Sequence, residues 1–347
     1  MAEGRGEITS IHYYAQPRAI REGRVPCDVV FVQCTPPDNF GFVNIGLSCE
    51  HMRAAIEKAK LVIAQVNAKY PYVCGDALFH VSEFDYFVEY DQEPYELPLI
   101  SGDDPISEKI GYNIATLIND GDCIQMGQGK IPNAILKCLM DKKDLGIHTE
   151  VFSDNILPLI DAGVFTGAKK QIDKRKIVST FIHGTRKLYD FVDHNDMIRI
   201  LPCDYTNAAS VISQNDNVVA INSALEVDLL GQIVADTVDG RPFSGVGGQL
   251  DFLRGAEESK GGRPIIALPA TAKRGTISRI VANIPEGHPI TSSRQDAHYI
   301  VTEYGVAELF GADTKERAKR MISIAAPEFR EDLERSFFAY MKKIGGI

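Results

Sequence analysis

Short apolar runs alternate with helix-type patterns along most of the chain. Residues 29–33, 61–66 and 122–126 are nearly continuous apolar runs, a pattern typical of strands that are buried on both faces. Helix-type spacing of apolar residues follows at 105–119 and 131–140. Strands that alternate with helices predict an α/β fold with open, mostly parallel sheets that helices cover on both faces.

The same patterns divide the chain into two predicted domains. Residues 90–105 are rich in proline and acidic residues, which is typical of a linker. The predicted domains are 1–95 and 96–347, and a chain of 347 residues is long enough for both. Further strands are expected at 146–152, 176–181, 197–201, 217–222, 232–236, 264–268 and 298–302, and further helices at 52–59, 154–162, 223–230, 306–310, 313–323 and 327–342.

The clearest chemical signal is a glycine turn followed by an acidic residue on the next predicted strand. The turn, Gly-Gln-Gly-Lys-Ile-Pro at 127–132, follows the strand at 122–126, and Glu150 lies near the end of the strand at 146–152. This order places the turn and Glu150 side by side at the carboxyl edge of a parallel sheet, where such sheets bind ligands. Glu150 is therefore a candidate nucleophile beside an oxyanion hole of backbone N–H groups. Tight packing of the turn and solvation of the acid remain the alternatives.

A second glycine cluster strengthens the case for a ligand site. Residues 244–252 include Gly245, Gly247 and Gly248, and the predicted strand before them ends at Asn222. Such a loop can direct consecutive N–H groups at an oxygen or a phosphate. A flexible hairpin would have the same glycine pattern, so the cluster alone leaves both interpretations open.

Other candidate groups are weaker. Glu226 and Asp228 are rivals to Glu150, but their predicted place near a helix N-terminus is explained by dipole complementarity. The eight histidines show neither metal-binding spacing nor a cluster with cysteine, so no metal site is expected. No Gly-x-Ser-x-Gly motif of a serine hydrolase is present.

Composition limits the class of protein and its surroundings. With 44% hydrophobic and 24% charged residues the chain is typical of soluble globular proteins. Its net charge of −10 argues against nucleic acid as the main partner. The seven cysteines are dispersed, without a CxxC pair, which favours a reducing compartment. The chain starts with polar residues and has no apolar run long enough to span a membrane. Together with the dispersed cysteines, these features predict a cytoplasmic protein.

Several segments, spread over nearly the whole chain, are together far more specific than one glycine turn. They are 32–38 (Val-Gln-Cys-Thr-Pro-Pro-Asp), 64–67 (Ala-Gln-Val-Asn), 75–82 (Gly-Asp-Ala-Leu-Phe-His-Val-Ser), 127–132, 148–154 (His-Thr-Glu-Val-Phe-Ser-Asp), 204–207 (Asp-Tyr-Thr-Asn), 221–228, 245–252 and 301–305 (Val-Thr-Glu-Tyr-Gly). In these segments the chain resembles the family of acetyl-CoA hydrolases and acyl-CoA:carboxylate CoA-transferases. It is most similar to the 4-hydroxybutyrate and butyryl-CoA:acetate CoA-transferase branch.

The resemblance implies roles for individual residues. The family's nucleophile is the glutamate on the strand after the Gly-x-Gly-x-Ile-Pro turn, a position that falls on Glu150. The two glycine loops would lie against CoA, and the backbone amides of Gln128 and Gly248 would hold the thioester oxyanion. The residues implied in CoA binding are Gly127, Gln128, Gly129, Lys130, Ile131, Asn222, Gly245, Gly247 and Gly248.

The resemblance also implies an activity. An enzyme of this type moves CoA between short-chain acids such as acetate, butyrate or 4-hydroxybutyrate, by ping-pong transfer through a glutamyl-CoA thioester. CoA, acyl-CoA and a small carboxylate are its substrates, no metal or redox cofactor is required, and the chain is expected to form a homo-oligomer. An acyl-CoA hydrolase, in which water resolves the same intermediate, is the alternative enzyme.

The resemblance places the start of the chain inside the first domain. Family members normally begin with further βα units, so the domain 1–95 is expected to be incomplete and the strand at 29–33 to be an exposed edge or to need a partner. A shortened product, a partner chain that supplies the units, or loss of activity would each account for this. A non-catalytic CoA-binding subunit is therefore the third candidate function.

Overall fold

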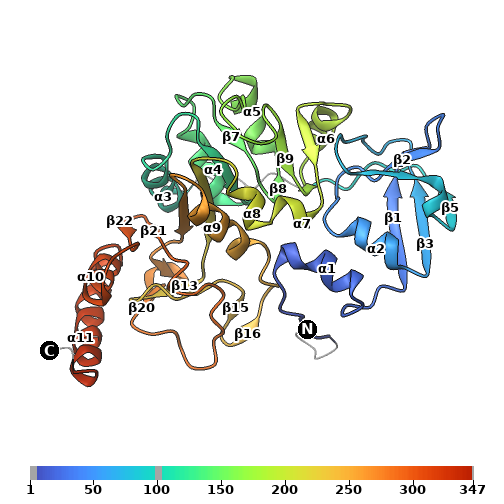
Figure 1. Cartoon of the computed structure of the whole chain (residues 1–347). Coiled ribbons are helices and arrows are strands. Elements are labelled where there is room, and N and C mark those ends of the chain that lie inside the picture. Colours follow the sequence, from blue (N-terminus) through green and yellow to red (C-terminus); the bar gives the residue numbers. More distant parts are fainter. Residues whose placement is uncertain (1–5, 98–103, 346–347) are drawn as a thin grey trace.

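A computed structural model describes residues 6–97 and 104–345 of the chain. Its larger sheets are mostly parallel and helices lie between the strands, which confirms the predicted α/β class. Figure 1 shows the N-terminal sheet and the C-terminal helices at opposite ends of the molecule, with the largest sheet between them. The predicted linker at 90–105 includes residues 98–103, which lie outside the described residues.

The N-terminal part contains a three-stranded parallel sheet in the order β1-β3-β5. Its strands are β1 (Val29–Cys34), β3 (Leu61–Val66) and β5 (Tyr86–Glu89). Helix α2 (Met52–Lys58) covers one face, because Ile56 shares a buried apolar cluster with Val30 and Val62. On the opposite face Phe31, Ile63 and Tyr86 are paired side by side across the strands, and Phe31 is 75% exposed.

A six-stranded sheet forms the centre of the molecule, in the order β22-β21-β17-β12-β6-β7. All neighbours are parallel except β21 and β22, which form an antiparallel hairpin. The strands are β6 (Cys123–Met126), β7 (Gly146–Ile147), β12 (Val218–Ser223), β17 (Arg263–Ala267), β21 (Tyr299–Thr302) and β22 (Gly305–Glu308).

Helices cover both faces of this sheet. On β12, Val219 and Ile221 share a core cluster with Ile110 and Ile135, from helices α3 (Pro105–Ala115) and α4 (Lys130–Lys137). The alternate residues Val218 and Ala220 instead share a cluster with Phe252 and Ala256, from helix α9 (Gln249–Glu258). Because successive side chains of a strand point to opposite faces, β12 is buried on both sides, as its apolar sequence predicts.

The remaining elements are short, apart from the two C-terminal helices. The other paired strands are β2 (Phe42–Asn44) with β4 (Leu78–His80), β8 (Val151–Phe152) with β10 (Phe181–Ile182), β9 (Ile177–Ser179) with β11 (Ile198–Ile200), β13 (Glu226–Asp228) with β14 (Ile233–Val234) and β20 (Ile280–Val281), β15 (Thr237–Val238) with β16 (Arg241–Pro242), and β18 (Thr271–Ala272) with β19 (Ile277–Ser278). The other helices are η1 (Tyr13–Ala15), α1 (Gln16–Arg21), η2 (Val81–Glu83), η3 (Asp154–Ile156), α5 (Leu157–Asp161), α6 (Arg186–Val192), α7 (Cys203–Thr206), α8 (Ala209–Ile212), η4 (Lys273–Gly275), α10 (Thr314–Ser323) and α11 (Pro327–Lys343).

Two predicted helices are wrong, since 223–230 and 306–310 contain strands. In the first segment, strand β13 turns back to β14, and the Asp228 carboxylate accepts hydrogen bonds from the backbone N–H groups of Leu230 and Gln232. In the second, β22 pairs with β21 along its whole length. Both segments are short, and apolar spacing over so few residues does not separate a helix turn from a strand that finds a partner.

Two further differences bear on the functional site. The strand predicted at 146–152 is interrupted, because β7 ends at Ile147 and β8 begins at Val151. The second glycine cluster leads directly into helix α9, with Gly248 as its N-cap residue, rather than into a hairpin. Both differences change the surroundings of Glu150, which lies between β7 and β8.

Candidate active site

The glycine turn and Glu150 lie at the carboxyl ends of two neighbouring parallel strands. Strand β6 leads into the turn at 127–129, and its neighbour β7 leads towards Glu150. The pairing extends past β7, because the His148 N–H donates to the Ile124 carbonyl at 3.1 Å. The Thr149 hydroxyl then donates to the Met126 carbonyl at 3.0 Å. The predicted juxtaposition at this edge of the sheet is therefore present in the structure.

The Glu150 carboxylate is enclosed by groups from two other elements. Asn207, immediately after helix α7, donates from Nδ2 to Oε2 of Glu150 at 2.7 Å. The backbone N–H of Gly248 also faces the carboxylate and favours its ionised form. Burial outweighs both contacts and, with the charges of Asp251 and Glu50, raises the pKa of Glu150 to about 7. Such a carboxylate is poorly solvated, which is the condition for nucleophilic attack.

Gly248 has no room for a side chain. A Cβ atom there would lie 2.0 Å from Oε2 of Glu150 and 2.2 Å from Nδ2 of Asn207. Because helix α9 begins at the next residue, Gly248 brings the positive end of the helix close to the carboxylate. A glycine is thus required at this position so that the backbone of the loop can lie close to Glu150 and Asn207.

A cavity of about 270 Å³ lies between the two glycine loops. Of the residues predicted to bind CoA, it is lined by Gly127, Gln128, Ile131, Asn222 and Gly245. The structure does not place Gly129, Lys130, Gly247 or Gly248 in its lining. Apart from the predicted residues, the lining contains Pro132, Ile221, Ser223, Ala235, Asp236, Ser244, Val246 and Gln249.

Polar groups in this cavity are already oriented by protein contacts. The Gln128 side chain donates to the His183 carbonyl at 3.0 Å. The Asn222 amide donates to Oε1 of Gln125 at 3.0 Å, an interaction between neighbouring strands. The Asp236 carboxylate accepts from the Thr291 hydroxyl at 2.5 Å.

Sequence reasoning missed three groups that surround Glu150: Asn207, Asp251 and Glu50. All three are in segments that resemble no simple catalytic motif. Glu50 accepts hydrogen bonds from the hydroxyls of Tyr13 and Ser48, and its backbone φ of 27° is unusual for a residue other than glycine. The sequence pointed to only two of them, because Asn207 lies in the family-like segment 204–207 and Asp251 in the segment 245–252.

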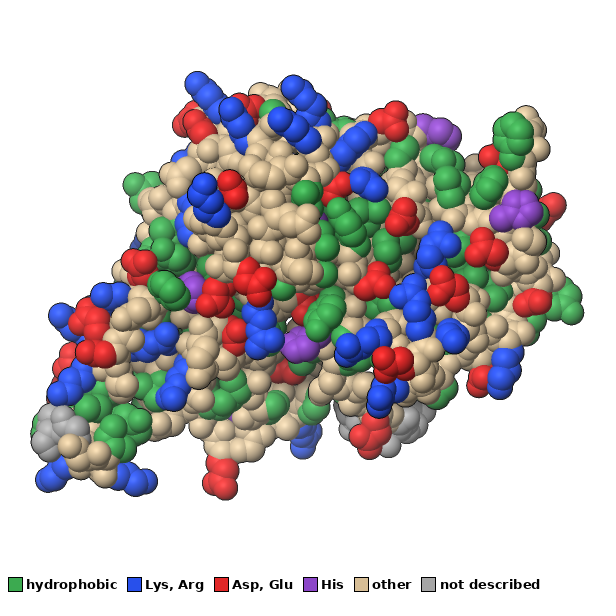
Figure 2. Space-filling view, in the orientation of Figure 1, with side chains coloured by type: hydrophobic (Ala, Val, Ile, Leu, Met, Phe, Trp, Pro, Cys, Tyr) green, Lys and Arg blue, Asp and Glu red, His purple; other side chains and the backbone are tan. Residues whose placement is uncertain are grey.

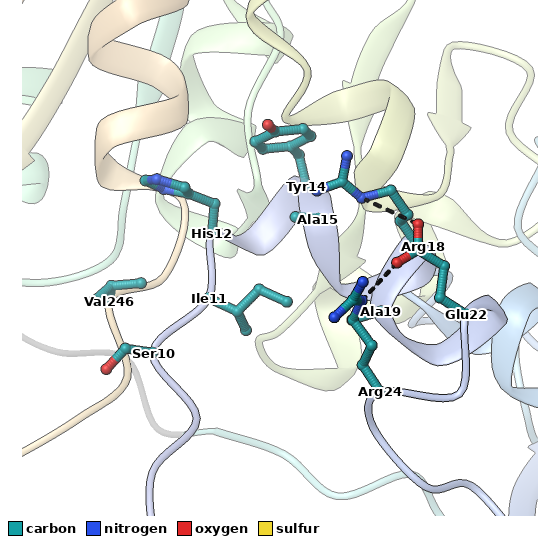
Figure 3. Close-up of a pocket in the computed structure, with 10 residues that line it drawn as sticks. All are labelled: Ser10, Ile11, His12, Tyr14, Ala15, Arg18, Ala19, Glu22, Arg24 and Val246. Atoms are coloured by element: carbon teal, nitrogen blue, oxygen red, sulfur yellow. Dashed lines mark hydrogen bonds and ion pairs between the residues drawn. The ribbon is translucent and has the colours of Figure 1, made fainter.

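The segment before helix α1 lies across this region and borders a second cavity of about 630 Å³. In Figure 3, His12 and Tyr14 come from this segment and Val246 from the glycine loop opposite. Arg18 and Arg24 flank Glu22 at one side, and both form ion pairs with it. Val246 lines both cavities, so the glycine loop separates them.

The rivals to Glu150 have structural roles. Glu226 lies on strand β13 and its Oε1 is 2.7 Å from Nδ1 of His288. Asp228 is buried in the hairpin that follows, where its carboxylate accepts three hydrogen bonds. The predicted position of both acids near a helix N-terminus is therefore wrong, because their segment is a strand.

The described parts of the chain contain neither a cluster of side chains suited to a metal ion nor a helix suited to a membrane span. Within residues 6–97 and 104–345, no group of three or more His, Cys, Asp or Glu side chains is arranged to hold a metal ion. No helix in those ranges is both long and apolar enough to cross a bilayer. Acidic and basic side chains are mixed over most of the face in Figure 2.

Comparison with known proteins shows the family. Residues 1–97 match the acetyl-CoA hydrolase/transferase N-terminal domain and residues 184–337 the corresponding C-terminal domain. The 4-hydroxybutyrate coenzyme A transferase of Clostridium kluyveri is 46% identical over 335 residues, which are 96% of this chain and 78% of the relative. The chain therefore belongs to the acetyl-CoA hydrolase/transferase family, and the predicted resemblance is confirmed.

Two further relatives have names of the same kind. The butyryl-CoA:acetate CoA-transferase of Anaerostipes caccae is 38% identical over 340 residues, covering 95% of this chain and 76% of the relative. The crystal structure of a 4-hydroxybutyrate CoA-transferase from Porphyromonas gingivalis has a TM-score of 0.86 at 41% identity, covering 98% and 82%. An acetyl-CoA hydrolase from Candida albicans is more distant, at 30% identity over 230 residues, 63% of this chain and 42% of the relative.

Proposed function

We propose that this protein is an acyl-CoA:carboxylate CoA-transferase that uses Glu150 as its nucleophile. The observation that carries the proposal is the desolvated Glu150 carboxylate, held by the Asn207 amide next to the N-terminus of α9. Gln249, the first residue of α9, lines the cavity between the glycine loops. The names of the more similar relatives support transfer rather than hydrolysis. Short-chain acids such as acetate, butyrate or 4-hydroxybutyrate are the proposed substrates.

The proposed reaction begins with attack on the thioester. An oxygen of Glu150 bonds to the carbonyl carbon of acyl-CoA, and the carbon–sulfur bond breaks with its electron pair leaving on the CoA thiolate. The product is a mixed anhydride between Glu150 and the acyl group. The thiolate then attacks the side-chain carbonyl carbon of Glu150, the carbon–oxygen bond to the acyl group breaks, and the acid leaves as a carboxylate. A glutamyl-CoA thioester remains, and an incoming carboxylate reverses both steps.

Each of these steps builds and collapses a negatively charged oxygen. The backbone N–H groups of Gln128 and Gly248 are the proposed donors to that oxygen, because Gln128 lines the cavity between the glycine loops and Gly248 lies against the Glu150 carboxylate. Gly248 faces the carboxylate in the present structure. Contacts of the long CoA molecule along the cavity would supply binding energy for desolvation at the reacting carbons.

The covalent intermediate is the test of this proposal. The protein is incubated with acetyl-CoA, reduced with borohydride, digested and analysed by mass spectrometry. Reduction of the thioester to an alcohol is expected at Glu150, whereas an acyl-enzyme at any other residue overturns the mechanism. Glu150→Ala is expected to abolish transfer of CoA between acids while CoA still binds, and Glu226→Ala, in the acid paired with His288, serves as the matched control.

Hydrolysis is the second candidate, and it uses the same intermediate. The two activities differ in what resolves the glutamyl-CoA thioester, since a transferase needs an acceptor carboxylate and a hydrolase needs water. Free CoA is therefore measured from acetyl-CoA with and without added butyrate. CoA release that is rapid without the acid favours the hydrolase. Formation of butyryl-CoA with little release of free CoA supports the transferase.

We further propose that the protein is a cytoplasmic homo-oligomer. All seven cysteines are free thiols, which supports a reducing compartment. An apolar sheet face that includes Phe31, Tyr86 and Val88 is exposed in the single chain, which supports association. Light scattering of the purified protein tests the oligomer, and a monomer at micromolar concentration would contradict it.

A further inference from the structure

The Asp251 carboxylate lies beside the Glu150–Asn207 pair but takes no part in the transfer steps proposed above. Asp251 is in the first turn of helix α9, three residues after Gly248, and is only 4% exposed. The Asn207 amide, which donates to Glu150 at 2.7 Å, also interacts with Asp251. One side-chain amide thus serves two carboxylates, and the position of one carboxylate affects how the amide faces the other.

One backbone hydrogen bond holds the Asp251 carboxylate, and His12 and Arg254 lie near it. The Tyr14 N–H donates to its Oδ2 at 3.1 Å, and Nδ1 of His12 lies 3.5 Å from its Oδ1. Arg254, one turn further along α9, stabilises the negative charge from the helix side, and its own guanidinium is held by Asp296 at 2.9 Å. The hydrogen bond from the Tyr14 N–H gives the carboxylate a defined position next to Asn207.

The charges that face Glu150 disfavour its ionised form. Burial acts first, and the carboxylates of Asp251 on α9 and Glu50 before α2 add to it, so that the pKa of Glu150 is raised to about 7. Burial also raises the pKa of Asp251, to about 6, so Asp251 is mostly ionised at the pH where Glu150 titrates. Tyr13 and Cys203 also face Glu150, but burial raises the pKa of each of these groups as well, so both are neutral near pH 7. The groups that favour ionisation of Glu150 are the Asn207 amide and the Gly248 N–H, which carry no net charge.

We propose that Asp251 is a positioning residue for CoA transfer, which orients the Asn207 amide towards Glu150 and holds a negative charge beside that nucleophile. This inference rests on the proposed function. The like charge makes Glu150 more basic, and a more basic carboxylate is the stronger nucleophile once it has ionised. His12 and Tyr14, which lie next to the Asp251 carboxylate, belong to the segment before helix α1, so the position of this segment affects the position of Asp251.

The test is the pH dependence of kcat/KM for acyl-CoA in Asp251→Asn, which keeps an acceptor for the Tyr14 N–H and removes the charge. The acid limb is expected to move to lower pH by about one unit, the size of effect that a nearby like charge produces. Titration of the substrate cancels, because both enzymes receive the same acyl-CoA. If the pH profile of kcat/KM in Asp251→Asn has a lower plateau but an acid limb at the unmodified pH, the inference is overturned. Asp251 then has only a structural role.

Glu258→Gln is the matched control, because Glu258 is an exposed acid on the same helix. Its acid limb is expected to coincide with that of the unmodified protein, and an equal shift would assign the effect to net charge rather than to Asp251. If Asp251→Asn does not fold, Asp251→Ser also removes the charge and keeps an oxygen suited to the first turn of a helix. The same downward shift is expected from it.

A readout without turnover separates this inference from the proposed function. Infrared difference spectra of protein labelled with 13C in the glutamate carboxyls, with Glu150→Gln as the reference, follow the ionisation of Glu150 directly. In Asp251→Asn this ionisation is expected at lower pH, and an unchanged midpoint overturns the inference. If Glu150→Ala retains transfer, the proposed mechanism fails, but the spectra still decide whether Asp251 controls Glu150.

Discussion

Asn207 and Glu150 are 57 residues apart in the chain, yet Nδ2 of Asn207 lies 2.7 Å from Oε2 of Glu150. Asn207 follows the last residue of helix α7 and is completely buried. Its amide is held next to the carboxylate by the backbone of a short helix rather than by a long flexible side chain. Glu150 therefore has a defined orientation before any substrate binds.

Asn207→Ala is expected to lower kcat for CoA transfer by about ten- to a hundredfold, because a hydrogen bond to a charged group is worth roughly 1.5–3 kcal/mol. Asn207→Asp places a third carboxylate beside Glu150 and Asp251, so its acid limb is expected to move to higher pH. Steady-state kinetics across the pH range measure both effects. Transfer by Asn207→Ala at the unmodified rate would show that the contact has no role in catalysis.

Gly248→Ala is expected to reduce turnover far more than it reduces stability. The added Cβ would overlap Oε2 of Glu150 and Nδ2 of Asn207, so the reacting groups must separate. Kinetics are compared with the melting temperature of the same preparation. A fall in melting temperature that accounts for the lost activity would instead identify Gly248 as a purely structural turn residue.

Gly247→Ala provides the comparison for that experiment. Gly247 has a φ of +59° and its Cβ position is open, so a substitution there strains the backbone without touching Glu150. It is expected to lower stability by roughly 1–2 kcal/mol, the cost of a side chain at a left-handed position. Chemical denaturation measures this loss. A stability unchanged by Gly247→Ala would show that the loop adapts to a side chain.

Glu150→Gln is expected to make the folded protein more stable at alkaline pH. The pKa of Glu150 is raised from 4.5 to about 7, so the folded state binds its proton more tightly than the unfolded state does. The ionised carboxylate consequently destabilises the fold fully above pH 7, and this cost decreases to zero below pH 4.5. Melting temperatures of both proteins are measured across that range. A difference that does not change with pH would contradict the buried charge.

Hydrogen exchange is expected to be faster in the N-terminal sheet than in the central one. One face of β1, β3 and β5 is exposed in the single chain, whereas β12 is covered by helices on both faces. Residues 6–95 should therefore exchange before residues 122–181, because less buried apolar surface protects them. Equal protection in a protein that is monomeric by light scattering would show that the N-terminal sheet is self-sufficient.

The local sequence was informative wherever the pattern was long or repeated. The apolar runs at 61–66 and 122–126 correspond to β3 and β6, and the C-terminal periodic segment to α11. Short segments were ambiguous: 223–230 and 306–310 contain enough apolar residues for one helix turn, but each finds a strand to pair with. Such pairing depends on residues distant in sequence, so no local pattern predicts it.

For the functional site, the amino-acid sequence by itself determined the order β6, glycine turn, α4, β7 and Glu150. That order is sufficient to bring the turn and the acid to one sheet edge, because parallel neighbours end on the same side. The identity of the groups around Glu150 was decided only by the tertiary structure. Asn207, Asp251 and Glu50 come from three separate segments, and only packing of these segments brings their side chains to one carboxylate. The raised pKa is likewise a property of that packing, since it arises from burial and from charges that are far away in the chain.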